Sequence, residues 1–264
     1  MKDFPLVSVI TTVYNTEKYV ERCFDSVMEQ TYPNIEFIVV NNGSSGNIEE
    51  IVEVYIAAYP KRKIKLLTLE ENQGVFNARI SGAELATGDY IAFIDSDDRI
   101  SIDFYRRLIS HAEKTGSDMV ATDFVFEGEN ELYYHNFNGF RSVNFKYLNE
   151  EVRQMFFKQH GLAFYWNLIW NKIYSIDLWK KACPYLKKNN KKIVMCDDMG
   201  LSCVLYCFSS HYENIHDVYY YYLRVGAGSS EGGKSAAKFK SILQDVKNVC
   251  GYPFSSAEKS PGLW

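Results

Sequence analysis

Three carboxylates that follow a short apolar run are the residues of this sequence best placed to do chemistry. The run from Tyr90 to Ile94 predicts a buried strand, and Asp95, Asp97 and Asp98 come directly after it. Because burying three carboxylates without partners is costly, we expect them just beyond the carboxyl end of the strand, where open α/β sheets bind ligands. An Asp-x-Asp pair there suits a hard divalent cation whose shell is completed by the phosphates of a sugar nucleotide. The alternative is a polar turn that only ends a strand.

Strand and helix patterns alternate through the first hundred residues and must position these carboxylates. Polar clusters follow the first, second and fourth strands, so Tyr14, Asn42 and Asp97 are expected to converge at one edge of a sheet. We predict an α/β fold with a Rossmann-like, mostly parallel central sheet flanked by helices on both faces. The expected strands are 7–11, 35–40, 64–69 and 90–94, with helices from Glu17 to before Pro33 and over 48–59 and 75–86.

The second half of the chain is less regular. The aromatic stretch 164–172 predicts either core residues or a wall for stacking the apolar faces of sugar rings. Asp197 and Asp198 open an apolar helical run, where acidic residues also serve as ordinary N-terminal caps. The other expected elements are helices over 102–114, 150–158 and 236–249, a strand over 119–124, a hairpin over 132–137 and 143–148, and a tyrosine-rich strand over 218–223.

Composition excludes several classes of protein. A net charge of −4 and a pI of about 5.8 leave no electrostatic footprint for nucleic acid. The six cysteines form no C-x-x-C pair and the five histidines no H-E-x-x-H motif, so neither a zinc site nor a disulfide framework is expected. No apolar run reaches membrane-spanning length and the start lacks a signal-peptide core. We expect a cytoplasmic protein, and leave open contact with the inner face of the membrane and a homodimer.

Six short motifs in a fixed order resemble those of inverting GT-A glycosyltransferases of family 2, of the bacterial surface-polysaccharide type. The resemblance covers roughly residues 5–230. The motifs are the opening strand 7–15, the Asn-Asn-Gly-Ser-Ser-Gly run 41–46, the stretch Asn72-Gln73-Gly74 with Ala78-Arg79 and Gly88-Asp89-Tyr90, the run Asp95-Ser96-Asp97-Asp98, the segment Trp170-Asn171-Lys172-Ile173-Tyr174 with Asp197-Asp198, and the Tyr220-Tyr221-Tyr222 strand with Gly228-Ser229.

The resemblance implies an enzyme that moves a hexosyl or N-acetylhexosaminyl group from a nucleotide-diphosphate sugar to a hydroxyl of a glycan or lipid-linked sugar. The donor is usually a UDP-sugar, and Mn²⁺ or Mg²⁺ assists. The resemblance also implies a GT-A fold whose second half, which binds the acceptor, is more irregular. We expect residues 1–125 to bind the donor, residues 126–230 to bind the acceptor and supply a base, and residues 231–264 to form a terminal helix and tail.

Roles for single residues follow from the same resemblance. Asn41 and Asn42 replace the usual acidic pair, and Thr12 replaces a commoner proline. Carried over by position, Thr12 and Tyr14 contact the nucleobase, Asn42 hydrogen-bonds it, Arg79 approaches the phosphates or ribose, Asp95 and Ser96 belong to the nucleotide-binding loop, Asp97 with Asp95 holds the metal, and Asp198 is the catalytic base.

Two other functions compete with this interpretation. A nucleotidyltransferase on a similar sheet needs a glycine-rich loop with a basic residue after its first strand, and residues 12–15 offer neither. A non-catalytic nucleotide-binding module finds its support in Asn41 and Asn42. The intact acidic run at 95–98 argues against that module.

Overall fold

The computed structural model of this protein describes residues 4–128, 132–133, 143–160, 164–187 and 197–224. One ten-stranded sheet runs through them in the order β3-β2-β1-β4-β9-β6-β10-β5, with β7 beside β6 and β8 beside β10. Strands β1 to β4, β6 and β10 run parallel, and β5, β7, β8 and β9 run antiparallel to their neighbours. The predicted α/β architecture with a mostly parallel sheet is therefore confirmed.

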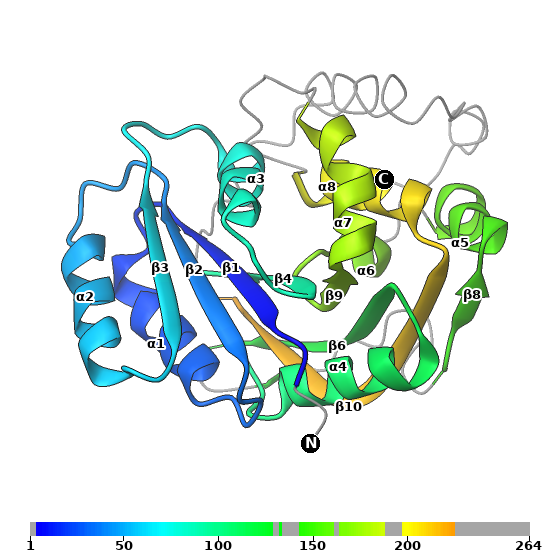
Figure 1. Ribbon diagram of the computed structural model, residues 1–264, viewed down its shortest axis with the longest axis horizontal. Coiled ribbons are helices and arrows are strands. Elements are labelled where there is room, and N and C mark those ends of the chain that lie inside the picture. Colours follow the sequence, from blue (N-terminus) through cyan, green and yellow to red (C-terminus); the bar gives the residue numbers. More distant parts are fainter. Residues whose placement is uncertain (1–3, 129–131, 134–142, 161–163, 188–196, 225–264) are drawn as a thin grey trace.

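The first half alternates strands and crossover helices as the sequence predicts. Figure 1 shows α1 and α2 on one side of strands β1 to β3 and α3 on the other. Strands buried on both faces need continuous apolar runs, and every residue of β2 is buried. The elements are β1 (Val7–Val13), α1 (Glu17–Met28), β2 (Ile35–Asn41), α2 (Ile48–Ala58), β3 (Lys63–Thr68), α3 (Val75–Glu84) and β4 (Tyr90–Asp95).

The second half completes the same sheet out of chain order. Strand β9 inserts between β4 and β6, antiparallel to both, and helices α7 and α8 pack on the α3 side (Figure 1). The elements are β5 (Arg99–Ile100), α4 (Phe104–Thr115), β6 (Met119–Glu127), β7 (Leu132–Tyr133), β8 (Lys146–Leu148), α5 (Glu150–Gln154), the π-helix η1 (Met155–His160), α6 (Phe164–Asn167), β9 (Lys172–Ser175), α7 (Ile176–Leu186), α8 (Asp197–Phe208) and β10 (His211–Leu223).

The hairpin expected over 132–148 is wrong. Strand β7 pairs with β6 and strand β8 pairs with the first residues of β10, so the parts of the two segments that the structure describes do not pair with each other. Alternating side chains predict a strand but cannot name its partner. The helix expected over 236–249 lies outside the described residues.

The aromatic stretch belongs mainly to the core. Trp166 is fully buried and Trp170 is 2% exposed, and the Trp170 ring stacks on Tyr220 with centroids 4.1 Å apart. These two tryptophans therefore cannot offer a face to a sugar.

Among the described residues, no helix is both long and apolar enough to cross a bilayer.

A buried carboxylate fixes the entry into strand β4. Glu36, on β2, is fully buried and accepts hydrogen bonds from Ser8 and from the backbone and side chain of Thr87, and pairs with Lys65 at 2.8 Å. Burial alone would raise the pKa of Glu36, but these partners outweigh it and lower the pKa. The hydrogen bonds of Glu36 therefore tie β1 and β2 to the loop that precedes β4.

We predict that Glu36→Gln destabilises the fold in a pH-dependent way. The pKa of Glu36 in the folded protein lies below the unfolded value of about 4.3. Ionised Glu36 therefore stabilises the fold above that pH, and this stabilisation is lost as the pH falls through the folded pKa. Urea unfolding should show a deficit of about 2 kcal/mol at neutral pH, which shrinks as the pH falls below the unfolded pKa of about 4.3. The exposed Glu53→Gln is the matched control. A deficit that stays constant with pH would contradict the assignment.

Candidate functional site

The carboxyl ends of β1, β2 and β4 gather most of the expected site residues at one edge. Thr12 lies opposite Asp95 in the β1–β4 register, and Asn42 donates its backbone N–H to Val13 at 2.9 Å. Tyr14, just past β1, is 46% exposed, so its ring is available for stacking. Ser96 is buried, and its hydroxyl lies 2.7 Å from that of Thr16. The Ser96 hydroxyl therefore helps to hold the loop after β1.

Arg79 is the centre of the charged part of the site. Its side chain is 5% exposed, and Nη1 donates to Asp198 Oδ1 at 2.6 Å. The same nitrogen also bonds Asp197, and Nη2 bonds Asp95. One cation from α3 thus joins the end of β4 to the start of α8. Asp95 and Asp198, expected in one site, are brought together by it.

Helix α8 comes close enough to α3 because of a glycine. A Cβ added at Gly200 would lie 3.3 Å from the ring of Phe76 on α3, closer than most side-chain contacts. The two helices contact each other in the described structure. Gly200 therefore lets the first turn of α8 reach Arg79.

Burial raises the basicity of two carboxylates beside Arg79, Asp95 and Asp198. Desolvation raises the pKa of Asp198 well above its ordinary value; Arg79 opposes this shift and Asp197 adds to it. Burial also raises the pKa of Asp95, against the effect of Arg79. A carboxylate with a raised pKa accepts a proton more readily than an exposed one. Asp198 is thus a partly buried carboxylate of raised pKa in contact with the Arg79 cation.

Asp97 belongs to the acidic run that follows β4. It is half-buried, and burial, followed by the neighbouring Asp95, raises its pKa to about 6. Within the described ranges, no cation lies at ion-pair distance from it. No group of three or more His, Cys, Asp or Glu side chains in that part of the chain is placed to hold a metal by itself. Two carboxylates, Asp97 and Asp95, are too few to fill the shell of a divalent cation, so a cation there would need phosphate oxygens as further ligands.

Asp98 has a structural role that its place in the acidic run does not reveal. It is 1% exposed, and it accepts from the Tyr220 hydroxyl at 2.7 Å and from the Leu223 N–H at 2.7 Å. The Tyr220 oxygen in turn accepts the Asp95 N–H at 3.0 Å. Sequence reasoning missed Tyr220; its place in a tyrosine-rich strand was the available signal.

The two asparagines at the end of β2, Asn41 and Asn42, make different contacts. Asn41 accepts from the Ser44 N–H at 2.8 Å and donates to Glu49 at 2.7 Å, a combination that an aspartate cannot make. Asn42 is 3% exposed, and its Oδ1 accepts from the Gln73 N–H at 2.9 Å. Its Nδ2 faces Asn72 Oδ1 at 3.4 Å. The backbone therefore fixes which way the Asn42 amide points.

Lys172, a motif residue for which the sequence predicted no role, is a second buried cation. Its ammonium donates to the Leu168 carbonyl and, at 2.9 Å, to Asn171 Oδ1. Burial lowers its pKa to about 7, and Asp198 acts in the opposite direction. Lys172 thus ties the aromatic turn to β9, and it lies close enough to Asp198 for the two charges to interact.

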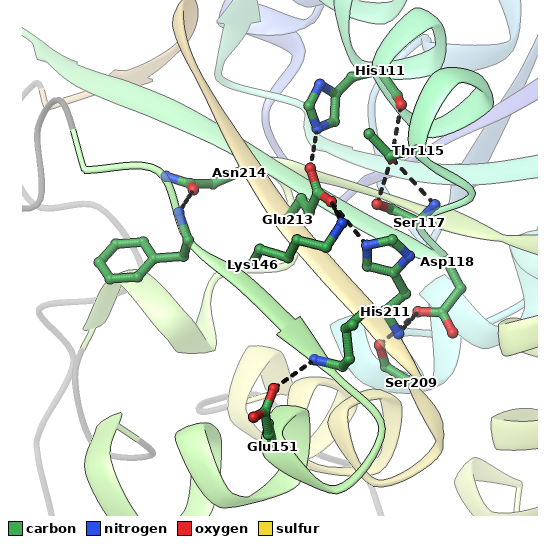
Figure 2. A network of polar contacts seen from close by, with 12 residues as sticks. His111, Thr115, Ser117, Asp118, Lys146, Glu151, Ser209, His211, Glu213 and Asn214 are labelled. Carbon is green, nitrogen blue, oxygen red and sulfur yellow. Dashed lines mark hydrogen bonds and ion pairs between the residues drawn. The ribbon is translucent and has the colours of Figure 1, made fainter.

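Another polar cluster lies away from Arg79. Figure 2 shows His111 and Lys146 converging on Glu213, which His211 also contacts. Burial would raise the pKa of Glu213, but the donors from these three residues outweigh it and lower the pKa. A cavity of about 660 Å³ opens beside the cluster. The Glu213 carboxylate already has its hydrogen-bond partners within the protein. The cluster therefore serves to join α4 and β8 to β10.

Comparisons with known proteins identify related glycosyltransferases. A family model described as "Glycosyl transferase family 2" matches residues 8–174, more than half of the chain. The uncharacterized glycosyltransferase EpsJ of Bacillus subtilis is 32% identical over 181 residues, covering 67% of this chain and 50% of EpsJ. Glycosyltransferase GlyA of Streptococcus pneumoniae is 30% identical over 178 residues, 66% of this chain and 25% of GlyA. The chain thus spans half or less of these two relatives.

Solved structures are similar over most of the chain. S. aureus TarS 1-349 in complex with UDP-GlcNAc superposes with a TM-score of 0.70 and 21% sequence identity. The match covers 92% of this chain and 66% of that one. At this identity the likeness shows the fold alone, whereas the family match rests on sequence. The chain belongs to glycosyl transferase family 2.

Proposed function

We propose that this protein is an inverting glycosyltransferase. It moves a sugar from a nucleotide-diphosphate sugar to a hydroxyl of a glycan or lipid-linked acceptor in bacterial surface-polysaccharide synthesis. The observation that carries the proposal is that Arg79 joins the end of β4, where Asp95 and the half-buried Asp97 lie, to Asp198, a partly buried carboxylate of raised pKa. The end of β4 suits a cation on the leaving group and Asp198 suits a base.

The donor side of the site stabilises the leaving group. Asp97 and Asp95 would hold Mn²⁺ or Mg²⁺, which supplies Lewis-acid neutralisation of the departing diphosphate. Thr12 and the exposed Tyr14 ring flank the position proposed for the nucleobase, and Asn42 lies beside them. The crystal structure of TarS with UDP-GlcNAc makes uridine nucleotides the first donors to test.

The acceptor side supplies the proton transfer. The acceptor hydroxyl oxygen attacks the anomeric carbon from the face opposite the diphosphate, and the bond from that carbon to the diphosphate oxygen breaks. The hydroxyl proton passes to Asp198, and the nucleoside diphosphate leaves with the bonding electrons. Inversion at the anomeric carbon follows from this in-line geometry, as in inverting glycosidases with water as the nucleophile.

A screen of nucleotide sugars for nucleotide release tests the function. We expect UDP release from a UDP-hexose or UDP-N-acetylhexosamine in the presence of Mn²⁺ or Mg²⁺. A nucleotidyltransferase would instead release pyrophosphate from UTP and a sugar phosphate. A binding module would bind UDP and never turn over.

The first prediction for the site concerns the metal. Asp97→Asn should remove the increase in UDP affinity that Mn²⁺ causes and cut turnover at least about 100-fold, because the cation loses its main ligand. Titration calorimetry of UDP with and without Mn²⁺ measures the first effect. Asp103→Asn, on a partly exposed carboxylate that pairs with Arg107, is the control. A variant that retains the Mn²⁺ effect would show that Asp97 is not a ligand.

The next prediction concerns the base. Asp198→Asn keeps shape and removes basicity, so transfer should fall by roughly 10² or more while UDP affinity stays almost unchanged. Asp197→Asn, its neighbour on the same Arg79 nitrogen, is the matched comparison. If Asp197→Asn loses transfer and Asp198→Asn does not, Asp197 is the base. Loss of folding in Asp198→Asn would favour a helix-capping role instead.

The last prediction here concerns base recognition. Asn42→Asp would keep the Gln73 bond and set a carboxylate oxygen near Asn72 Oδ1, where a donor such as the uracil ring N–H relieves the repulsion. We expect UDP to bind more tightly by about 1 kcal/mol, since an ionic hydrogen bond replaces a neutral one. The preference for UDP over CDP should widen. Calorimetry of both nucleotides with both proteins decides; an unchanged ratio would mean that Asn42 does not contact the base.

A further inference from the structure

The three bonds of Arg79 place it between the two halves of the proposed reaction. Nη2 serves Asp95, at the end of the donor-side strand β4, and Nη1 serves Asp197 and Asp198 on α8. The side chain is 5% exposed, so water does not screen these contacts as it would at the surface. A single positive charge faces three carboxylates.

A guanidinium suits this position and an ammonium does not. Its N–H groups form a rigid planar fork, so Asp95 and the α8 pair are held at a set separation. A lysine could keep the charge, but as a single point on a flexible stem it could not hold both ends at once. The packing of Gly200 of α8 against Phe76 of α3 brings the α8 carboxylates to the same fork.

We propose that Arg79 is a positioning residue for the catalytic base, and that it acts on transfer through Asp198. This inference rests on the proposed function. By fixing Asp198 relative to Asp95, Arg79 sets where the base stands with respect to the bound donor. A shift of about 1 Å in such a group costs on the order of 10² in rate.

The charge of Arg79 adds to its positioning role. Asp198 is surrounded by Arg79 from α3, Asp197 from its own helix, Asp95 from β4, and Lys172 and Tyr174 from β9. Arg79 is the cation in direct contact with it, and it lowers the pKa that burial raises. Displacing the cation therefore leaves Asp198 protonated to a higher pH.

The test is a double-mutant cycle between Arg79→Lys and Asp198→Asn. The measured rate is that of UDP release in the presence of an acceptor. Arg79→Lys alone should lose about 100-fold in kcat and keep UDP affinity within about threefold. The acid limb of its pH profile should move to higher pH. In the Asp198→Asn background, adding Arg79→Lys should cost less than about threefold more, because both changes remove one function.

The control is Arg62→Lys. Arg62 also makes several bonds, to the carbonyls of Tyr32, Pro33, Met28 and Gln30, and none to a carboxylate of the site. We expect it to leave kcat unchanged. If Arg79→Lys does not fold, Arg79→Lys with Asp197→Asn removes one of the excess negative charges, and its rate is compared with that of Asp197→Asn.

Two outcomes would overturn the proposal. If the losses multiply in the double variant, Arg79 acts independently of Asp198. If UDP affinity falls in parallel with kcat, Arg79 is a donor contact instead. Failure of the proposed function is distinguishable, because the unaltered protein would then release no UDP from any donor.

Discussion

One buried cation shared by three carboxylates is the constraint on which the site depends. Neither α8 nor the end of β4 could bring Asp95, Asp197 and Asp198 together without it, because uncompensated buried charges repel and resist desolvation. Arg79 comes from α3, a helix that packs on β1 and β2. The sheet, through α3, therefore determines where the acidic side chains of two distant segments meet.

Much of this arrangement could be predicted from the sequence, for identifiable reasons. The strands β1 to β4 have clear apolar runs and short connections, so their parallel order and common carboxyl edge follow from general rules of α/β folds. The helix beginning at Asp197 was visible in its apolar pattern. These are local signals, and local signals are what a single sequence carries most clearly.

What could not be predicted depends on long-range pairing. Lys172–Ser175 is short, and nothing in its four residues says that it lies between two strands formed much earlier in the chain. The functions of Tyr220 and Asp98 depend on each other across that same sheet. The amide at Asn41 departs from the acidic motif of the family, and its bonds to Glu49 and Ser44 show why an amide fits at this position.

The late strand β9 has a consequence for how the chain is made. Tyr90 on β4 lies opposite Ser175, and β6 meets β9 along its other edge. Until residue 175 has emerged from the ribosome, β4 and β6 lack β9, the strand that pairs with both of them. Open strand edges favour association with other chains. Closing the sheet is thus a contact of long sequence separation, the kind that slows folding. The acidic loop after β4 is therefore synthesised well before β9, the strand that completes the sheet beside it.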